Sequence, residues 1–445
     1  MRPAISVQKV AQPKVLSDMA VQGTLRKIGQ RFASPWLAFA VAVIIRIAVL
    51  IHTMHNVSYQ WLWGKNETGH LARSLLAGHG YRGAFDGTTQ LTAWIAPGYP
   101  LLVTLVFSIF GLYTPLSTWI VIALNLLFSA LTTLSVFALG KRYFGSGVGA
   151  LAAWIWACWY YLAVVPLLIW DTSLSALLLS LELLFVLHLE TSERWRDWIL
   201  FGIFCGGACL INPSLTSVVP FFLIYLGYRW KTKNKAFASR LAVSTAALIL
   251  TVTPWLFRNY VVLGKFAFIR SDLPAQLYYG NHPGLGNEKA DMSNSPAGDP
   301  SEYNRLGEAA YMSEMRKLFL QYLRGHPGEF LRRSMVRFLT YWSAPPGSPW
   351  GIVSMLAVVG LGLAIFEYGS SVVPLGIPLI FFPIVYYFVF VWPKYRHPIE
   401  PAIIVLFAFA ISRIAYQLNQ MLYYVGLQLQ THNDNSSGSQ PTSSQ

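Results

Sequence analysis

Residues 115–139, PLSTWIVIALNLLFSALTTLSVFAL, run without a charged side chain and are followed at once by Gly140, Lys141 and Arg142. About 20 consecutive apolar residues are enough to cross the hydrocarbon core of a bilayer as a helix. Lys and Arg gather on the cytoplasmic side of membrane proteins. The stretch therefore predicts a transmembrane helix whose C-terminal end faces the cytoplasm.

The composition of the whole chain agrees with this reading. Of the 445 residues, 54% are hydrophobic and only 12% are charged, against about 25% charged in ordinary soluble domains. The net charge is +14, but the basic residues lie in short runs between apolar stretches, which indicates no nucleic-acid partner. Cys158, Cys205 and Cys209 all fall inside apolar stretches, so no disulfide framework is readable. The composition excludes a soluble globular protein.

Ten further apolar segments flank the first one, at residues 36–54, 98–113, 147–167, 172–189, 198–212, 214–229, 241–257, 349–366, 373–392 and 400–417. If the short segment at 98–113 crossed the bilayer, Lys141 and the basic run at 229–240 would lie outside, against the positive-inside rule. We therefore expect that segment to lie in the outer interface. The sequence predicts an all-α polytopic membrane protein with about ten transmembrane helices and an interfacial helix pair in its first external loop.

The same pattern divides the chain into five parts. Apolar residues at helical spacing over 301–324, followed by a second such stretch over 329–341, predict a helical external loop. The final residues are too polar to bury a core. We expect a basic cytoplasmic arm at 1–35, a transmembrane catalytic module at 36–257 that includes external loop 55–114, an external helical loop at 258–346, C-terminal transmembrane helices at 347–418 and a polar disordered tail at 419–445.

Two carboxylates stand out at the expected outer ends of spans. Glu67 follows the first span and Asp171 precedes the run at 172–189. An ionised side chain deep in a membrane protein costs about 3 kcal/mol or more, so it marks an aqueous cavity, an ion pair or a function. The alternative is helix capping, because negative charge is favourable in the first turn of a helix. Residue type and position alone leave both interpretations open.

Basic side chains lie at the same expected face. Arg258 follows one span, and Lys394, Arg396 and His397 lie between the last two apolar runs. Arginine binds phosphate oxygens with a planar fork, so these residues are candidates for contact with a lipid phosphate. The alternative is that they anchor the span ends in the interface. No spacing of metal ligands is recognisable, so no metal site is predicted, although a divalent metal stays open.

Several short motifs in order resemble the GT-C polytopic glycosyltransferases of the family 39-like group, which is related to protein O-mannosyltransferases and aminoarabinose transferases. The resemblance covers roughly residues 36 to 410, and the motifs are moderately specific by their order and spacing. They are Glu67 with LARSLLAG at 71–78, APGYP at 96–100, Phe110-Gly111, TPWLFRNY at 253–260, YGN at 279–281, HPGEF at 326–330 and YRHP at 395–398.

This resemblance implies a transferase that takes a sugar from a polyprenyl-phosphate carrier. It implies an active site at the outer face, a first-loop carboxylate matched by Glu67 and a second acidic position matched by Asp171. Many members have two adjacent acids where this chain has Asn66 and Glu67. Tyr395 and Asn281 lie within matching motifs and are candidate substrate-binding residues.

The expected function is therefore transfer of a sugar to an acceptor hydroxyl. Glu67 would be the base, and Arg396, Lys394, Arg258 and His397 would surround the leaving phosphate. The partners would be the lipid-linked donor, an acceptor protein, lipid or glycan, and membrane lipids. The location would be a bacterial cytoplasmic (inner) membrane, with the site on its outer side.

Two other functions remain open from the sequence. A polyprenyl-glycan ligase or polymerase would also use outer Arg and His residues, but would not call for an acid in the first loop. A non-catalytic lipid or solute transporter would place ionisable residues near mid-membrane on broken helices, often in repeated halves. Here they concentrate at outer span ends, without a visible repeat.

Overall fold

A computed structural model describes residues 34–54, 63, 66–233, 236–285, 290, 295–343 and 349–437. Within these residues the secondary structure is helical, and the β pairing amounts to a single bridge between Arg82 and Leu91. The predicted all-α class is confirmed. Residues 1–33 of the predicted basic arm lie outside the described residues.

Six helical stretches in the described residues are long and apolar enough to cross a membrane. Four of them are the single helices α2 (Pro35–Met54), α6 (Pro115–Phe144), α9 (Thr172–Leu189) and α12 (Ala238–Leu263). The fifth is the stretch Trp350–Phe388, which contains α17 (Trp350–Tyr368), α18 (Val373–Phe381) and α19 (Ile384–Phe388). The sixth is the stretch Pro393–Tyr424, within which α20 (Glu400–Ser437) begins. A seventh is the pair α7 (Ser146–Cys158) and α8 (Tyr160–Val164), which is bent by 61°.

The predicted count of ten spans is not confirmed. Two of the ten predicted spans correspond to α10 (Trp195–Ile211) and α11 (Val219–Thr232), which have 17 and 14 residues. The chain between them forms the 3-10 turn Pro213–Ser217. Two other predicted spans fall in the stretch Trp350–Phe388, in which α17 ends before Gly369 and the 3-10 turn Gly369–Val372 leads to α18. Proline lacks the N–H that a helix interior needs, so the helix ends where Pro213 follows Asn212.

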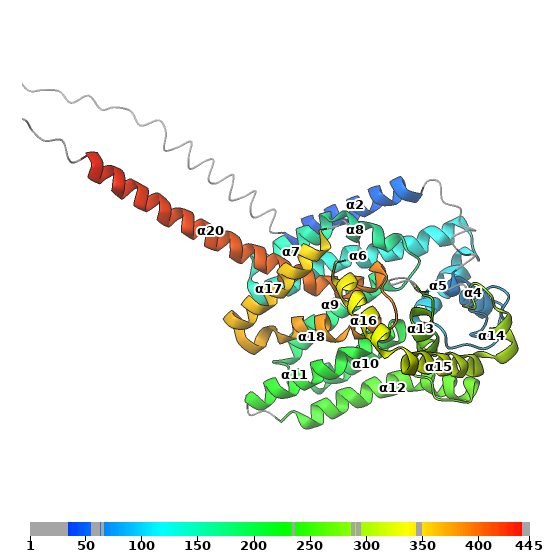
Figure 1. The fold of residues 1–445 in the computed structure, drawn as a ribbon. Helices are drawn as coiled ribbons and strands as arrows, with labels where there is room; N and C mark the ends of the chain where they lie inside the picture. Colours follow the sequence, from blue (N-terminus) through cyan, green and yellow to red (C-terminus); the bar gives the residue numbers. More distant parts are fainter. Residues whose placement is uncertain are drawn as a thin grey trace, which may run out of the picture.

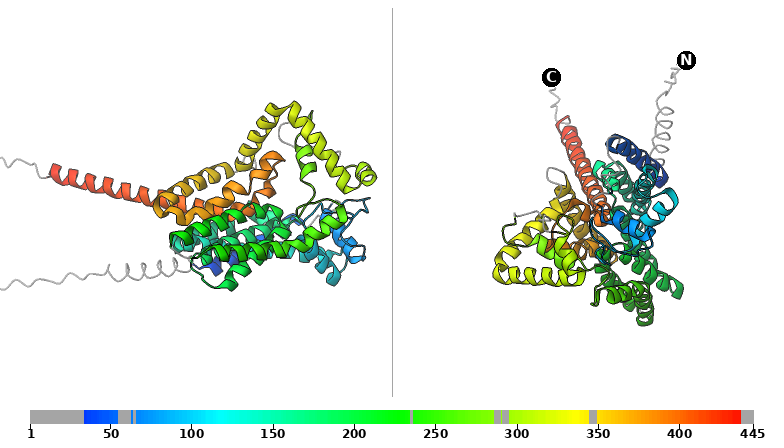
Figure 2. Two further views of the ribbon diagram at one scale, coloured as in Figure 1. Left: turned by 90° about the horizontal axis from the view of Figure 1, so that it is seen from below. Right: turned by 90° about the vertical axis from the view of Figure 1, so that its right-hand side faces the viewer.

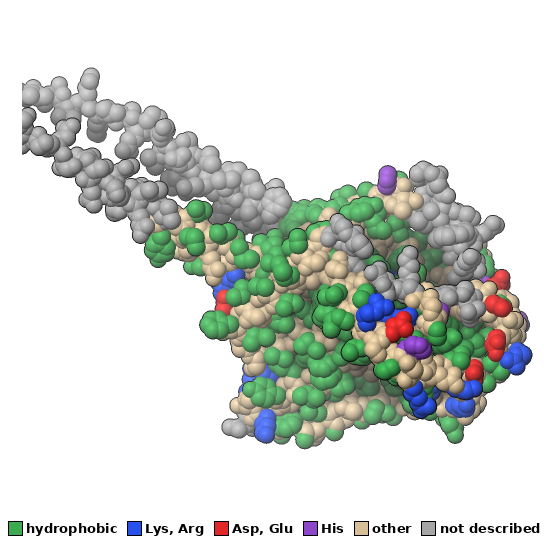
Figure 3. All heavy atoms as spheres, viewed as in Figure 1, with side chains coloured by type: hydrophobic (Ala, Val, Ile, Leu, Met, Phe, Trp, Pro, Cys, Tyr) green, Lys and Arg blue, Asp and Glu red, His purple; other side chains and the backbone are tan. Residues whose placement is uncertain are grey.

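The spans run side by side (Figure 1). Turns connect them at one end, and additional helices lie at the other. The turn from α6 to α7 and the turn from α11 to α12 lie at one end. At the other end lie α4 (Glu67–Leu76), α5 (Gly98–Phe110), α13 (Leu273–Gly280), α14 (Ser301–Leu306) and α15 (Glu308–Gly325). Figure 3 shows charged side chains gathered at this second end, whereas the face between the two ends is mainly hydrophobic. We call the second end the external end, after the orientation that the sequence predicts.

The external helices follow the predicted order. Helices α4 and α5 pack against each other and form the expected pair in the first external loop. The predicted helix over 301–324 is divided at Gly307, whose φ of 76° is costly for residues with a Cβ, into α14 and α15. Helix α16 (Pro327–Ser343) then leads toward α17. In the left view of Figure 2, α15 and α16 stand out from the bundle as the two arms of an arch.

Arg46 lies fully buried inside α2 and closes the break between α7 and α8. Its Nε donates to the Ser129 hydroxyl at 2.9 Å, and its Nη2 and Nη1 donate to the carbonyls of Trp156 and Ala157 at 3.3 and 3.4 Å. The last carbonyls of a helix have no partner within that helix. The buried Arg46 guanidinium thus donates to carbonyls at the end of α7. These hydrogen bonds explain how an arginine is tolerated within a transmembrane helix.

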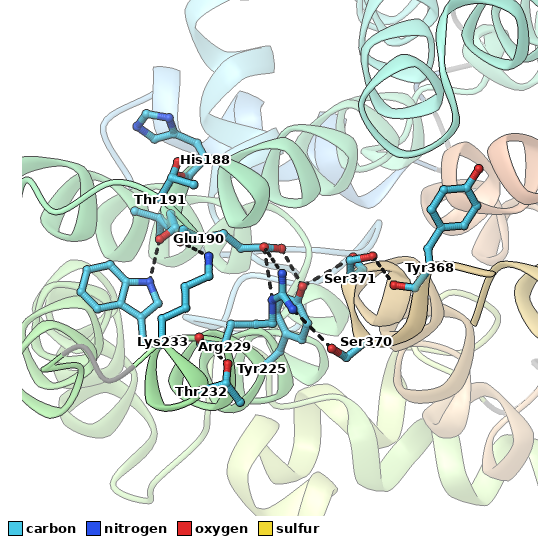
Figure 4. Close-up of polar contacts among 12 residues, drawn as sticks. His188, Glu190, Thr191, Tyr225, Arg229, Thr232, Lys233, Tyr368, Ser370 and Ser371 are labelled. Carbon is cyan, nitrogen blue, oxygen red and sulfur yellow. Dashed lines mark hydrogen bonds and ion pairs between the residues drawn. The ribbon is translucent and has the colours of Figure 1, made fainter. Parts of the chain in front are cut away.

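A second polar cluster ties three helices together at the end opposite the external helices (Figure 4). Glu190, directly after α9, accepts hydrogen bonds from the Tyr225 hydroxyl at 2.6 Å and from Nε and Nη2 of Arg229 at 3.3 and 3.1 Å. Arg229 also donates to the Ser370 hydroxyl at 3.4 Å, and Lys233 donates to the Glu190 carbonyl at 3.1 Å. The cluster joins the ends of α9 and α11 to the turn that follows α17.

Helix α20 differs from the expectation for the C-terminus. It continues to Ser437, whereas the polar disordered tail was expected from residue 419. Leu418, Met421 and Leu422 are exposed on this extension. Residues without branching at Cβ, such as Leu, Met and Gln, lose little side-chain freedom in a helix, which favours its continuation.

The arrangement of basic turns predicts the orientation in the membrane. Lys141 and Lys317 are both exposed, at opposite ends of the spans. Lys317→Cys should react with a membrane-impermeant maleimide added to intact cells, whereas Lys141→Cys should react only after permeabilisation. The parent chain is the background control for its own three cysteines. Labelling of Lys141→Cys, but not Lys317→Cys, in intact cells would contradict this orientation.

Candidate functional site

A small pocket opens at the external end of the bundle. Its wall combines parts of the chain that are far apart in sequence: the first external loop, the turn before α9, the end of α10 and the segment before α13. We call it the outer pocket, and its lining residues are Thr68, Ile95, Ala96, Tyr99, Trp170, Asp171, Ile211 and Arg270.

Asp171 lies in this wall immediately before α9. Its carboxylate accepts a hydrogen bond from the Ser175 hydroxyl at 3.0 Å, and Asn212 Nδ2 donates to the same hydroxyl at 3.1 Å. In this part of the chain the Asp171 side chain caps no backbone N–H of α9. The capping alternative therefore does not describe how Asp171 is used.

Glu67 is the first residue of α4, but another residue caps that helix. The Asn66 side chain accepts from the Gly69 backbone N–H at 3.0 Å and donates to the Ile169 carbonyl at 3.2 Å. Asn66 thus starts α4 and also ties it to the turn that carries Asp171. The Glu67 carboxylate lies within electrostatic range of Lys394, Arg270 and Asp272.

Two cations accompany these carboxylates. Arg270 pairs with Asp272 and donates from Nε to the Trp94 carbonyl at 2.9 Å. Lys394 Nζ lies 3.7 Å from the centre of the Trp170 ring, and an aromatic face attracts a cation at this distance. Both cations lie within electrostatic range of Glu67 and Asp171. The structure thus brings together Glu67, Asp171 and Lys394, which the sequence predicted, with Arg270, which it did not.

Burial sets the protonation behaviour of the two acids. Burial raises the pKa of Glu67 above its ordinary value, although its own backbone N–H, Lys394 and Arg270 act in the opposite direction. Burial likewise raises the pKa of Asp171, against the Ser175 hydrogen bond and the attraction of Arg270. Burial acts to lower the pKa of Arg270, but the combined attraction of Asp272, Tyr395 and Asp171 raises it above its ordinary value. A carboxylate with a raised pKa is a stronger base.

Tyr395 joins the same region from the turn before α20. Its ring stacks on that of Tyr386 at a centroid distance of 4.8 Å, and the Tyr386 hydroxyl is 2.9 Å from the Ser214 hydroxyl. Arg270 and Asp272 act electrostatically on Tyr395. The predicted substrate-binding residue Tyr395 therefore lies beside the charged groups of the outer pocket.

Arg258 and Asn281 have other surroundings. Arg258 donates to the carbonyls of Thr92 at 2.5 Å and Tyr81 at 2.9 Å, so it fastens α12 to the first external loop. Asn281 is fully buried and donates to the Phe388 carbonyl at 2.7 Å, which ties the end of α13 to α19. Neither residue belongs to the lining of the outer pocket.

Arg396 and His397 point into the helix bundle. Arg396 donates to the carbonyls of Trp342 at 3.0 Å and Tyr341 at 3.4 Å. His397 Nδ1 lies 2.7 Å from a carboxylate oxygen of Glu400. Both side chains are buried and lie outside the pocket lining. No group of three or more His, Cys, Asp or Glu that could hold a metal ion occurs among the described residues, so the divalent metal stays an open prediction.

Arg270 and Asp272 are the residues that sequence reasoning missed. They lie in a long external loop, and the residues around them, Phe268, Ile269 and Leu273, carry no motif. Their partner Trp94 is 176 residues away from Arg270. The available signal was that Arg270 and Asp272 lie close together between apolar residues. Charged residues in apolar surroundings usually have a polar partner.

The comparisons with known proteins address the fold. Residues 95–257 match the sequence profile of the dolichyl-phosphate-mannose-protein mannosyltransferase family. No curated protein matches the chain. The oligosaccharyltransferase of Archaeoglobus fulgidus, in complex with Zn and sulfate, matches with a TM-score of 0.51 and 14% identity over 89% of this chain and 51% of that chain.

Two further solved structures are similar. The same Archaeoglobus enzyme tethered with an acceptor peptide containing the NVT sequon has a TM-score of 0.51 and 13% identity, over 87% of this chain and 50% of that chain. ArnT from Cupriavidus metallidurans bound to undecaprenyl phosphate has a TM-score of 0.39 and 13% identity, over 85% and 78%. This chain spans about half the length of the oligosaccharyltransferase. It is an integral membrane protein with the fold of the GT-C type membrane glycosyltransferases.

Proposed function

We propose that this protein transfers a sugar from a polyprenyl-phosphate carrier to an acceptor hydroxyl at the outer face of the membrane. The observation that carries the proposal is a charged group at the external end. Asp171 and Arg270 line the outer pocket, and Glu67 and Lys394 both lie within electrostatic range of Arg270. This grouping supplies a base and positive charge in the same place. The match of residues 95–257 to a family of dolichyl-phosphate-mannose-dependent transferases supports the same chemistry.

The proposed step forms one bond and breaks one bond. The acceptor oxygen bonds to the anomeric carbon of the sugar, and the bond from that carbon to the phosphate oxygen breaks. The acceptor proton moves to the Glu67 carboxylate, and the bonding electrons leave with the phosphate of the carrier. Lys394 and Arg270 stabilise the charge that develops on this phosphate, an effect that is strongest where water is excluded.

The remaining residues take positions around this step. Asp171, held by Ser175, orients the acceptor or keeps Arg270 and Lys394 in place. Tyr395 forms an aromatic wall beside the sugar. Arg258 and Asn281 support the surrounding backbone, because they donate to backbone carbonyls. Arg396 donates to backbone carbonyls through Nη1, and His397 pairs with Glu400 through Nδ1. The acceptor is a protein, lipid or glycan, and the membrane is the bacterial inner membrane, with the site on its outer side.

Glu67→Gln tests the base. The substitution keeps the size of the side chain and removes the proton acceptor, so transfer per folded molecule should fall by about 100-fold or more. Affinity for undecaprenyl phosphate should change little. In the wild type the rate should fall as the pH drops through the raised pKa of Glu67, because the protonated acid cannot accept a proton. That acidic limb should be absent from Glu67→Gln.

Asn66→Ala is the matched control for Glu67→Gln. It removes the actual cap of α4, so it should cost about 1 kcal/mol of stability while the folded protein keeps its base. Turnover close to wild type in folded Glu67→Gln would contradict the assignment of Glu67 as the base.

Lys394→Met and Arg270→Ala test the phosphate contact. Each removes a positive charge from the outer pocket, so affinity for undecaprenyl phosphate should fall by about 10-fold or more, the usual scale for a charge-assisted hydrogen bond. Arg270→Lys should restore only part of this loss, because a point charge replaces a planar fork. The measurement is equilibrium binding to the detergent-solubilised protein.

Arg396→Ala is the comparison for this pair. Its guanidinium donates to backbone carbonyls, so its removal should lower thermal stability and leave binding by the folded protein unchanged. Weakened binding in Arg396→Ala, together with normal binding in Lys394→Met and Arg270→Ala, would contradict the placement of the phosphate.

A further inference from the structure

Glu308, the first residue of α15, lies in a polar cluster outside the catalytic groups described above. Its side chain is buried, with 3% of its surface exposed. Oε1 accepts from the Ala93 backbone N–H and from the Ser271 hydroxyl, each at 2.7 Å. Oε2 accepts from the Tyr303 hydroxyl at 2.5 Å and from the Thr92 hydroxyl. One carboxylate therefore gathers four donors from three separate segments of the chain.

The segment that begins at Thr92 is held from a second side. Arg258 donates to the Thr92 carbonyl, while the Thr92 hydroxyl donates to Glu308. A cation at the end of α12 and an anion at the start of α15 therefore flank the same peptide. Oppositely charged groups on the two sides of one peptide restrict its position more strongly than neutral donors and acceptors do.

This clamped segment carries the hydrogen bonds that position Arg270. The Ser271 N–H donates to the Ala93 carbonyl at 2.9 Å, and Arg270 Nε donates to the Trp94 carbonyl at 2.9 Å. Glu308 contacts both sides of this pairing, through the Ala93 N–H and through the Ser271 hydroxyl. Glu308 therefore holds the backbone of residues 92–94 against residues 270–271, and this pairing positions Arg270 in the outer pocket.

We infer that Glu308 is a positioning residue: it locks the segment before α13 onto the first external loop and thereby sets Arg270 for binding of a phosphate that Glu308 itself does not contact. This inference rests on the proposed function for its effect on binding. Its structural part, the lock between residues 92–94 and 270–271, is independent of that function.

Hydrogen exchange measures the lock directly. In Glu308→Gln the amide oxygen accepts fewer hydrogen bonds, and the new NH₂ group opposes the donors around it. Peptides covering 88–96 and 264–280 should therefore exchange about 10-fold faster or more in the folded full-length protein. Glu308→Asp, which keeps the charge, should lie between Glu308→Gln and the wild type. Unchanged exchange in Glu308→Gln overturns the inference.

Glu329→Gln is the matched control. Glu329 is also near the start of an external helix and pairs with the buried Arg333, but its partner lies on its own helix. It should leave exchange over 88–96 and 264–280 unchanged. If Glu329→Gln accelerates these peptides as much as Glu308→Gln does, the lock is a general property of the external helices and the inference is wrong.

A double-mutant cycle links the lock to the pocket. Glu308→Gln should weaken binding of undecaprenyl phosphate several-fold in the wild type and have no further effect in Arg270→Ala, because its influence passes through that guanidinium. Additive effects contradict the role of Glu308 and leave the proposed function intact. Normal binding in Arg270→Ala itself contradicts the phosphate role of Arg270, and with it the effect of Glu308 on affinity.

Discussion

Charge burial at the end of an apolar bundle is the constraint on which this structure depends. Two half-buried carboxylates, Glu67 and Asp171, lie at this end, and burial raises the pKa of both. Lys394 and Arg270 offset only part of this effect. The resulting group places two acids and two cations close together, which is why we propose that it exchanges a proton and attracts an anion.

The rest of the fold keeps these four groups in place. Asn66 binds α4 to the turn before Asp171, and the Ser175–Asn212 pair joins the start of α9 to the end of α10. Arg46 closes the break between α7 and α8, and the Glu190–Arg229 cluster fixes the far ends of α9 and α11. Hydrogen bonds to ionised groups are about twice as strong as neutral ones. A few of them can therefore fix the position of long helices along their axes, which non-directional apolar packing does not fix.

The sequence predicted the fold class because long runs without charge have few alternatives to a membrane helix. It also predicted that Glu67 and Asp171 share one face, since the basic turns fixed the orientation of each span. It did not predict the number of spans, because the break at Pro213 and the short helices α18 and α19 depend on packing between helices. It could not separate Lys394 from Arg396, two residues away, because a charge pattern does not show that Arg396 faces the carbonyls of Tyr341 and Trp342. Arg270 was missed because its partners lie in the first external loop.

The most direct measurement is an experimental structure of the full chain with undecaprenyl phosphate bound, since the central claim is that Lys394 and Arg270 receive a lipid phosphate beside Glu67. The account predicts phosphate oxygens within about 3.2 Å of Lys394 Nζ and of the Arg270 guanidinium, in the outer pocket. A phosphate bound instead against Arg396 or Arg258, or at the end of the bundle that carries Lys141, would contradict it.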